Sequence, residues 1–153
     1  MAKPNPANSN NSSIELDASD HKIIEALRNN ARASIRDIAK ATKIRPSTIH
    51  LRIQKLIKNS IIEKFTLRLN DKAIGENFIV FMFINTSKDL SKSFFADPRL
   101  KEAFGVTGEY DLLLKYKFKD ISEFNDYVIN LRKNNDIIKT LTTVCTIKLK
   151  EEN

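Results

Sequence analysis

Apolar residues recur at helical spacing in the first part of the chain. After Asp17, the residues Ile23, Ile24 and Leu27 form one apolar stripe. Asp17 is a suitable N-cap because its side-chain oxygens can accept hydrogen bonds from the first backbone N–H groups, and Asp20 follows three residues later. The pattern therefore predicts a first helix that begins after Asp17.

A second helix is predicted over residues 34–41. Ser34 is its N-cap, and Asp37 again stands three residues after the cap. The apolar side of this helix consists of Ile35, Ile38 and Ala39. Residues 42–45 are predicted to form the turn that follows.

The third helix is predicted to begin at Pro46, because proline lacks a backbone N–H and has the φ angle of a first helical residue. Its apolar side, which must face the other two helices, consists of Ile49, Ile53, Leu56 and Ile57. At about 100° per residue, the opposite side carries Ser47, Leu51, Gln54, Lys55 and Lys58, while Thr48, His50 and Arg52 lie on the flanks. A short helix, a four-residue turn and a longer helix with a polar outer face are the plan of a helix-turn-helix.

The second half of the chain has a different rhythm. Residues 61–71 alternate and predict an extended segment, and Gly75 marks a boundary. The later patterns predict a strand at 77–86, a short helix at 90–96, a hairpin with strands at 100–107 and 112–118, a helix capped by Asp120, and a strand at 137–150. The inward side of the capped helix is predicted to carry Ile121, Phe124, Tyr127, Val128 and Leu131. The order βαββαβ is the ferredoxin-like plan, in which both helices cover one face of a four-stranded sheet.

The first predicted strand is apolar on both of its faces. One face carries Phe78, Val80, Met82 and Ile84, and the other carries Ile79, Phe81 and Phe83. Because the two helices cover only one face of the sheet, the second apolar face needs another cover. We expect a homodimer, sheet against sheet, and the sequence leaves open which set of residues meets the partner.

The predicted fold class is α+β, with an N-terminal (winged) helix-turn-helix domain followed by a ferredoxin-like βαββαβ regulatory domain. The expected boundaries are a disordered tail over residues 1–13, a DNA-binding domain over 14–60 with the helix-turn-helix at about 34–58, an extended linker over 61–76, and the regulatory domain over 77–150.

The net charge of +7 is concentrated in the first half of the chain. Residues 14–70 carry twelve Lys and Arg against six Asp and Glu, whereas residues 71–153 carry thirteen against thirteen. A basic excess around the third helix favours a polyanionic partner over a merely solvated basic face or a generic three-helix packing unit. The expected DNA-binding residues include Arg45, Lys55 and Lys58 for phosphates, and His50, Arg52 and Gln54 for base edges in a major groove. The small residues Ser47 and Thr48 are expected to let the start of the helix enter that groove closely.

Several classes of protein are disfavoured by composition. The single cysteine, Cys145, excludes an intramolecular disulfide and suits a reducing compartment. The longest apolar run, residues 78–84, is too short to span a bilayer, and residues 1–13 have no apolar signal-peptide core. Metal-ligand spacing, a phosphate-binding loop and a catalytic triad are all missing from the sequence. We expect a cytoplasmic protein that is not an enzyme and needs no cofactor, metal or membrane.

Four motifs in order resemble the Lrp/AsnC (feast/famine) family of bacterial and archaeal transcription regulators. They are "LDASDHKIIEALRNNARASIRDIAKATKI", "STIHLRIQKL", "VTGEYDLLL" and "TLT", and the resemblance extends over residues 16–150. It implies a sequence-specific DNA-binding regulator that acts as a homodimer, or as a tetramer or octamer of such chains, under the control of an amino-acid effector. Three features depart from the family pattern. Arg45 stands where a capping serine is usual, and Ser60 stands where a glycine ends the recognition helix. The usual glycine before the last strand is also missing from "NNDII".

The resemblance also implies where an effector binds. In this family, effectors bind at the conserved hairpin, where regulatory domains of neighbouring dimers meet. Carried over, this implies that Gly108, Tyr110, Asp111 and Thr142 are effector-binding residues. The alternative is that Gly108 and Asp111 serve only the turn, which both residue types favour by themselves.

Two other function classes share these two domains. Siroheme decarboxylases resemble the family in both domains, and such an enzyme needs a substrate cleft with basic and histidine side chains. A small-molecule sensor without DNA binding predicts no salt-dependent affinity for DNA.

Overall fold

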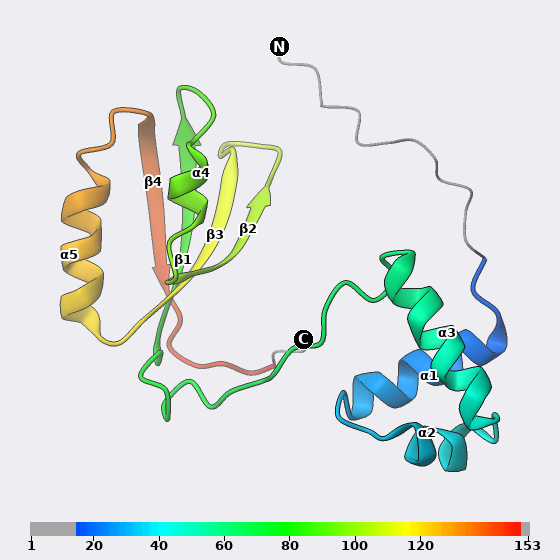
Figure 1. Cartoon of the computed structure of the whole chain (residues 1–153). Coiled ribbons are helices and arrows are strands. Elements are labelled where there is room, and N and C mark those ends of the chain that lie inside the picture. The colour runs from blue at the N-terminus through cyan, green and yellow to red at the C-terminus, as the bar shows by residue number, and fades with distance from the viewer. Residues whose placement is uncertain (1–14, 151–153) are drawn as a thin grey trace. The chain divides into compact units, whose positions relative to one another are not determined.

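The computed structural model describes residues 15–150, and the predicted tail over residues 1–13 lies outside them. The chain divides into two compact units, one ending at Leu67 and the other beginning at Arg68. Among the described residues, the first unit, here the helical unit, holds three helices, and the second, the sheet unit, holds four strands and two helices (Figure 1). The predicted order of a helix-turn-helix followed by an α+β sheet domain is confirmed.

The three helices of the helical unit bury the stripes that their spacing predicts. Their bounds are Ala18–Asn29 for α1, Ile35–Thr42 for α2 and Pro46–Lys58 for α3. Their shared core consists of Ile23, Ile38, Ile49 and Leu56. The prediction that Ile57 faces inward is wrong, because this side chain is 45% exposed. It lies about 100° around the helix from Leu56, at the edge of the buried stripe.

Both α1 and α2 begin with capping boxes, at the predicted residues. Oδ1 of Asp17 accepts the backbone N–H groups of Ser19 at 2.8 Å and of Asp20 at 2.9 Å. The Asp20 carboxylate accepts the Asp17 N–H in return at 3.2 Å. Ser34 and Asp37 make the same reciprocal pair at the start of α2. These side chains satisfy backbone donors that have no partner within the helix.

Helix α3 is capped differently at its two ends. Arg45 precedes Pro46 and makes no side-chain cap. At the other end Ser60 has a φ of 56°, and its N–H donates to the Ile57 carbonyl at 3.0 Å, while the Ile61 N–H donates to the Leu56 carbonyl at 2.9 Å. This is a Schellman motif, and Ser60 takes the left-handed conformation that glycine adopts more readily.

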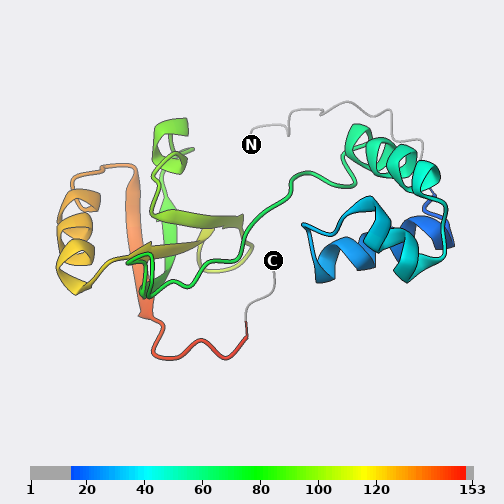
Figure 2. The same cartoon turned by 60° about the horizontal axis from the view of Figure 1, so that its bottom comes forward.

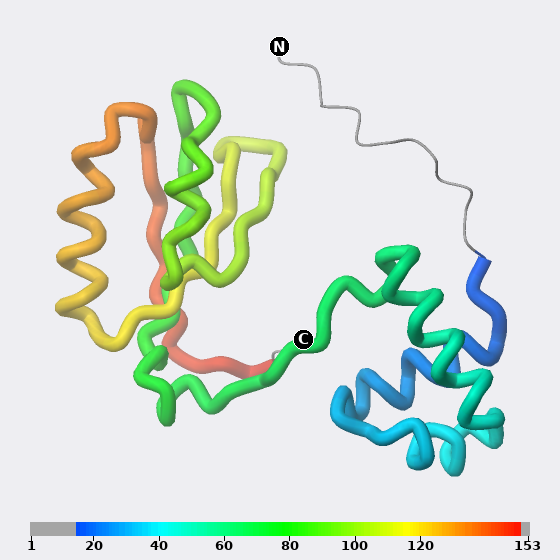
Figure 3. Tube along the Cα trace, viewed as in Figure 1, coloured from blue at the N-terminus to red at the C-terminus, as the bar shows by residue number. Residues whose placement is uncertain are grey.

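The segment that follows α3 forms no strand within residues 59–77, all of which the structure describes. The predicted winged form of the helix-turn-helix is therefore wrong for this chain. A wing requires two paired strands, and the alternating residues 61–71 have no paired strand among the described residues. The path of this segment can be followed in Figure 3.

The sheet has the strand order β2-β3-β1-β4, and all neighbouring strands are antiparallel. The strands are β1 (Phe78–Thr86), β2 (Leu100–Gly105), β3 (Leu112–Phe118) and β4 (Ile137–Val144). Helices α4 (Lys92–Phe95) and α5 (Ile121–Leu131) cover one face of the sheet (Figures 1 and 2). Helix α4 and strand β2 are shorter than predicted, and β4 ends at Val144 rather than at residue 150.

The core of the sheet unit lies between the sheet and its two helices. Its buried residues are Val80, Met82, Ile84, Leu114, Tyr116, Phe118, Tyr127 and Leu131, with Phe94 and Phe124 packed against them. The helix face of β1 is therefore the one with Val80, Met82 and Ile84. Asp120 caps α5 as predicted, by accepting the Glu123 N–H at 3.0 Å.

One predicted core residue of α5 lies outside this core. Ile121 is 61% exposed, so its predicted inward position is wrong. It is the first residue of the helix, and helical side chains lean towards the N-terminus. Its side chain therefore lies beyond the turns that pack on the sheet.

After β4 the chain continues beside residues 68–77 (Figure 3). The Cys145 N–H donates to the Ile79 carbonyl at 2.9 Å, and Lys148 Nζ donates to Asp71 Oδ2 at 2.6 Å. The two segments line a cleft of about 480 Å³. The last described residues thus leave the predicted strand but stay bonded to the sheet unit.

Candidate nucleic-acid interface and effector loop

Helix α3 presents a polar and cationic surface on the side opposite its buried stripe. The side chains of Arg45, Ser47, His50, Gln54, Lys55 and Lys58 are exposed, and Thr48 is half-buried on a flank. Gln54 Nε2 lies 3.0 Å from His50 Nε2, so these two polar side chains are hydrogen-bonded one turn apart. Helix α3 contains no Asp or Glu. The helix therefore offers hydrogen-bonding groups and positive charge, and it carries no acidic side chain of its own.

Arg52 is engaged inside the helical unit. Its Nη1 donates to Asp17 Oδ2 at 2.7 Å and to Asp20 Oδ1 at 2.8 Å, and the Asp20 side chain is buried. These bonds tie α3 to the cap of α1. Arg52 therefore has a structural role, because its guanidinium has two carboxylate partners, and its predicted base contact stays a prediction.

The same contacts shift the acid–base equilibria of the cap. The backbone N–H of Asp20, together with the Arg52 guanidinium, holds the pKa of the Asp17 carboxyl below its usual range. The two carboxylates raise the pKa of Arg52 in turn. The fold therefore favours the ionised carboxylate of Asp17 and the protonated guanidinium of Arg52.

The face of the sheet opposite α4 and α5, here the open face, carries a continuous apolar row. The strand register places Phe104, Leu113, Phe83 and Leu141 side by side across β2, β3, β1 and β4. At the two edges of the sheet, Phe104 is 51% exposed and Leu141 is 48% exposed. The Ile79, Phe81 and Phe83 set of β1 therefore lies on the open face, and the Val80, Met82 and Ile84 set lies against the helices.

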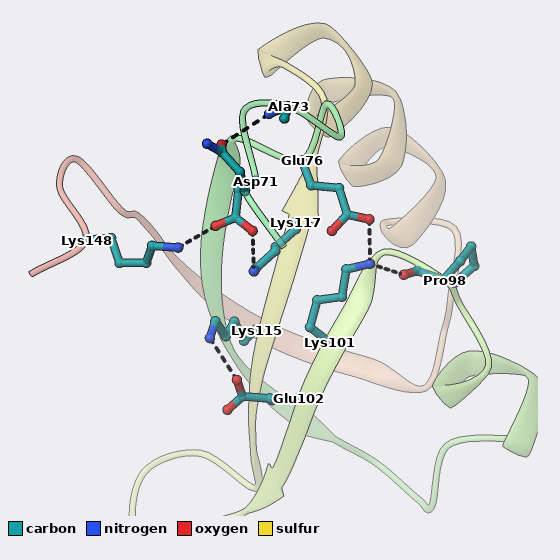
Figure 4. A network of polar contacts seen from close by, with 10 residues as sticks. Asp71, Ala73, Glu76, Pro98, Lys101, Glu102, Lys115, Lys117 and Lys148 are labelled. Carbon is teal, nitrogen blue, oxygen red and sulfur yellow. Dashed lines mark hydrogen bonds and ion pairs between the residues drawn. The ribbon is translucent and has the colours of Figure 1, made fainter. Parts of the chain in front are cut away.

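Lysines on the open face have acidic partners within the chain. Lys115 Nζ donates to Glu102 at 2.8 Å, and Lys117 Nζ donates to Asp71 at 2.8 Å, as Figure 4 shows. Burial raises the pKa of Asp71, but the hydrogen bonds from Lys117 and Lys148 outweigh it and lower that pKa overall. The positive charges of these strands are therefore balanced locally, and the row of apolar side chains dominates the surface beside them.

The predicted effector hairpin is a tight loop between β2 and β3. Gly108 has a φ of 139°, a backbone conformation that residues with a Cβ rarely adopt. Asp111 Oδ2 accepts the Thr86 N–H at 2.8 Å, so this carboxylate holds the loop against the end of β1. The Tyr110 ring lies 5.6 Å from the Phe83 ring, on the open face. Asp111 and Gly108 therefore do serve the loop itself.

Two residues outside the predicted effector set, Lys139 and Glu109, form an ion pair at the hairpin. Lys139 of β4 donates to the Glu109 carboxylate, and its Nζ lies 5.1 Å from the centre of the Tyr110 ring. This pairing raises the pKa of Lys139. Lys139 is distant in sequence from the hairpin, so only the pairing of β1 with β4 brings them together.

Thr142 does not share a pocket with the hairpin in this chain. It pairs with Met82, so it lies on the helix face of the sheet, whereas Tyr110 lies on the open face. Thr142 lines a cleft of about 440 Å³ between α5 and β4, together with Thr140, Val128 and Arg132. Within one chain, the structure brings together Gly108, Tyr110 and Asp111 but not Thr142, and the effector role of all four residues stays a prediction.

The enzymatic alternative, a siroheme decarboxylase, needs a cleft lined by histidine and basic side chains. Neither of the two clefts is lined by a histidine. Within residues 15–150, no three His, Cys, Asp or Glu side chains are grouped so that they could hold a metal ion. No helix in these residues combines the length and the apolar character needed to cross a bilayer.

Two family models match the chain. Residues 16–57 match the AsnC-type helix-turn-helix domain, and residues 81–153 match the Lrp/AsnC ligand binding domain. An HTH-type transcriptional regulator of Pyrococcus horikoshii is 34% identical over 145 residues, which covers 90% of this chain and 97% of the relative. The HTH-type transcriptional regulator FL11 of the same organism is 32% identical over 119 residues, or 75% of this chain and 79% of FL11.

Solved structures share the fold. AsnC of E. coli has a TM-score of 0.78 at 24% identity and covers 91% of this chain and 97% of its own. A transcriptional regulator of Neisseria meningitidis, solved in complex with L-methionine, has a TM-score of 0.82 at 22% identity and covers 90% of this chain and 94% of its own. With its helix-turn-helix, its ligand-binding domain and these relatives, the chain belongs to the Lrp/AsnC family of transcriptional regulators.

Proposed function

We propose that this regulator binds a specific double-stranded DNA site through the outer face of α3. The observation that carries the proposal is an exposed, acid-free helix face at the end of a helix-turn-helix. Ser47, Thr48, His50 and Gln54 are assigned to base edges in the major groove, and Arg45, Lys55 and Lys58 to phosphates. Arg52 positions α3 through its carboxylate partners.

The test is a binding selection from random double-stranded DNA with the purified full chain. A dimer should select a roughly palindromic site whose half-sites lie about one helical turn apart. Three cations on each α3 give six phosphate contacts per dimer, so affinity should fall about a thousandfold between 50 and 200 mM salt. The proposal is refuted if the selection recovers only random sequences. It is also refuted if the affinity for DNA does not change with salt concentration.

We further propose that the open face of the sheet is covered by a second copy of this chain. The apolar row crosses all four strands, and the lysines beside it are paired within the chain, so an apolar and electrically balanced partner fits this face. A self-complementary contact of this kind gives a homodimer, from which tetramers or octamers can be built. The expected site of action is the cytoplasm, and no enzymatic activity is proposed.

An amino-acid effector is proposed to bind at the hairpin of Gly108, Tyr110 and Asp111. A carboxylate can receive the ammonium group, and the Gly108 backbone is open to close approach. The complex of the Neisseria relative with L-methionine supports this class of ligand. Effector binding can change DNA affinity only if it favours one assembly state over another.

Calorimetric titration with the twenty amino acids, paired with sedimentation, tests the effector site. Asp111→Asn is the informative variant, because the amide oxygen can still accept the Thr86 N–H while the charge is lost. It should bind the effector at least tenfold more weakly and leave DNA binding without effector unchanged. Thr142→Ala should weaken the same response, because the proposed site lies where a neighbouring copy can contribute Thr142. If the Asp111→Asn protein binds the effector as tightly as the unaltered protein does, the assignment of the effector site to the hairpin is refuted.

A further inference from the structure

An apolar side chain stands in the middle of the polar face of α3. Leu51 is 65% exposed, whereas Ile49 and Leu56 of the same helix are buried in the core of the helical unit. At about 100° per residue, Leu51 lies almost opposite the buried stripe. Ser47 and Lys55 lie one turn away from it on either side along the helix. Leu51 is therefore not needed for the packing of the three helices.

A single exposed leucine is ordinary on a protein surface and is favourable in a helix. What distinguishes Leu51 is its position among groups that suit a nucleic acid. Lys55 and Lys58 supply positive charge, His50 and Gln54 supply hydrogen-bonding groups, and the helix holds no acid. On the edges of base pairs in a major groove, the C5-methyl group of thymine is the one apolar feature.

We propose that Leu51 is a specificity-determining residue that contacts the C5-methyl group of a thymine in each half-site. The inference rests on the proposed function, because it requires α3 to lie in a major groove. It goes beyond that function by naming the base and the atom that this helix reads. The contact removes the leucine side chain and the thymine methyl group from water together.

The side chain next to Leu51 on the same face suits the same kind of base pair, an A·T pair. Gln54 stands three residues after Leu51, and one N–H of its amide is directed to His50 when His50 Nε2 accepts. The amide oxygen and the second N–H then remain for the N6 and N7 positions of an adenine. Leu51 and Gln54 together therefore favour A·T pairs at adjacent positions of the half-site.

The test replaces each thymine of the selected site, one at a time in both half-sites, with deoxyuridine. This change removes only the methyl group. For the unaltered protein, one position should show an affinity loss of about fourfold per half-site, which is the fold-change expected for one buried methyl group. The Leu51→Ala protein should bind the thymine site more weakly and should lose the difference between thymine and deoxyuridine at that position.

Ile57→Ala is the matched control, because Ile57 is an exposed apolar residue of the same helix on the flank of the buried stripe. It should keep the full response to deoxyuridine. Alanine is the best helix former, and Leu51 is exposed, so Leu51→Ala should keep its circular dichroism spectrum and thermal midpoint.

The outcomes separate this inference from the proposed function. If the protein selects no specific DNA, the proposed function fails and the role of Leu51 fails with it. If specific DNA is bound but no deoxyuridine position weakens binding, only the role of Leu51 is refuted. That role is also refuted if Leu51→Ala responds to deoxyuridine as strongly as the unaltered protein does.

Discussion

The helical unit and the sheet unit expose different kinds of surface. In the helical unit, the side of α3 that faces away from the core is polar and cationic. In the sheet unit, the face that carries no helix is apolar across all four strands, and its lysines are paired with acids. Neither surface contributes to the core of its own unit. The difference supports the proposal of two kinds of partner, DNA for the helical unit and a second copy of the chain for the sheet unit.

The largest effect is expected from charges placed on the apolar row of the open face. Phe104→Lys combined with Leu141→Lys should raise the dissociation constant of the proposed dimer at least about a hundredfold. Each copy loses two exposed apolar side chains that the dimer would bury, and gains two unpaired charges. Sedimentation across a concentration series measures this constant. Ile121→Lys with Ile129→Lys, on exposed positions of α5, is the control and should leave it unchanged. A stable monomer of the unaltered chain at micromolar concentration would contradict the proposed dimer.

The second effect concerns the cationic surface of α3. Lys55→Gln and Lys58→Gln should each weaken DNA binding about tenfold at low salt, and they should do so alike for specific and random DNA. Each should also reduce the slope of log affinity against log salt by about two, because a dimer loses two phosphate contacts. Lys119→Gln removes an exposed lysine of the sheet unit and should change neither quantity. Fluorescence anisotropy across a salt series gives both values.

A third effect should be confined to the helical unit. Asp20→Ala removes half of the α1 capping box and one partner of Arg52, and should lower the free energy of unfolding of this unit by about 2 kcal/mol. Amide hydrogen exchange can report the two units separately, so the amides of the sheet unit should be unaffected. Asp37→Ala, which removes a capping partner but no ion pair, should have a smaller effect. Equal losses in both units would show that their stabilities are coupled.

The Asp17 carboxyl predicts an acid dependence of the same unit. Its pKa is lowered in the fold, so it stabilises the helical unit at neutral pH, and this stabilisation is lost as the pH falls through the lowered value. The loss should begin near pH 4, close to the ordinary value of 3.8, and continue below it. Arg52→Gln should weaken this dependence, because it brings the pKa of Asp17 nearer to that value. Circular dichroism between pH 6 and pH 2 measures it, and an unchanged profile in the variant would refute the role of Arg52.

The smallest effect is expected at the end of α3. Ser60→Gly relieves a left-handed backbone of a residue with a Cβ but adds freedom to the unfolded chain, so the helical unit should gain about 0.5 kcal/mol. Ser122→Gly, in helix α5, is the control and should instead destabilise the sheet unit by about 0.5 kcal/mol. Denaturant unfolding together with hydrogen exchange measures the stability of the helical unit and of the sheet unit separately. A loss of stability in Ser60→Gly would mean that the serine side chain itself matters there.

Local features of the molecule were predictable from the sequence. The capping boxes at Asp17 and Ser34, the start of α3 at Pro46 and the order of the elements in the sheet unit follow from residues a few positions apart. The buried stripes followed from periodicity, except at the edges, where Ile57 and Ile121 are exposed. Periodicity gives the direction of a side chain around its own helix, but it does not say how far the neighbouring surface extends.

The sequence by itself thus determined the two units, the buried side of each helix and the cationic character of α3, because each depends on short-range spacing and on charge. Only the tertiary structure decided the partners of Arg52, the face of the sheet that stays open, the contact of Lys139 with Tyr110 and the separation of Thr142 from the hairpin. These depend on strand register and on how helices distant along the chain pack together. A shift of one residue in that register moves every side chain of a strand to the other face of the sheet.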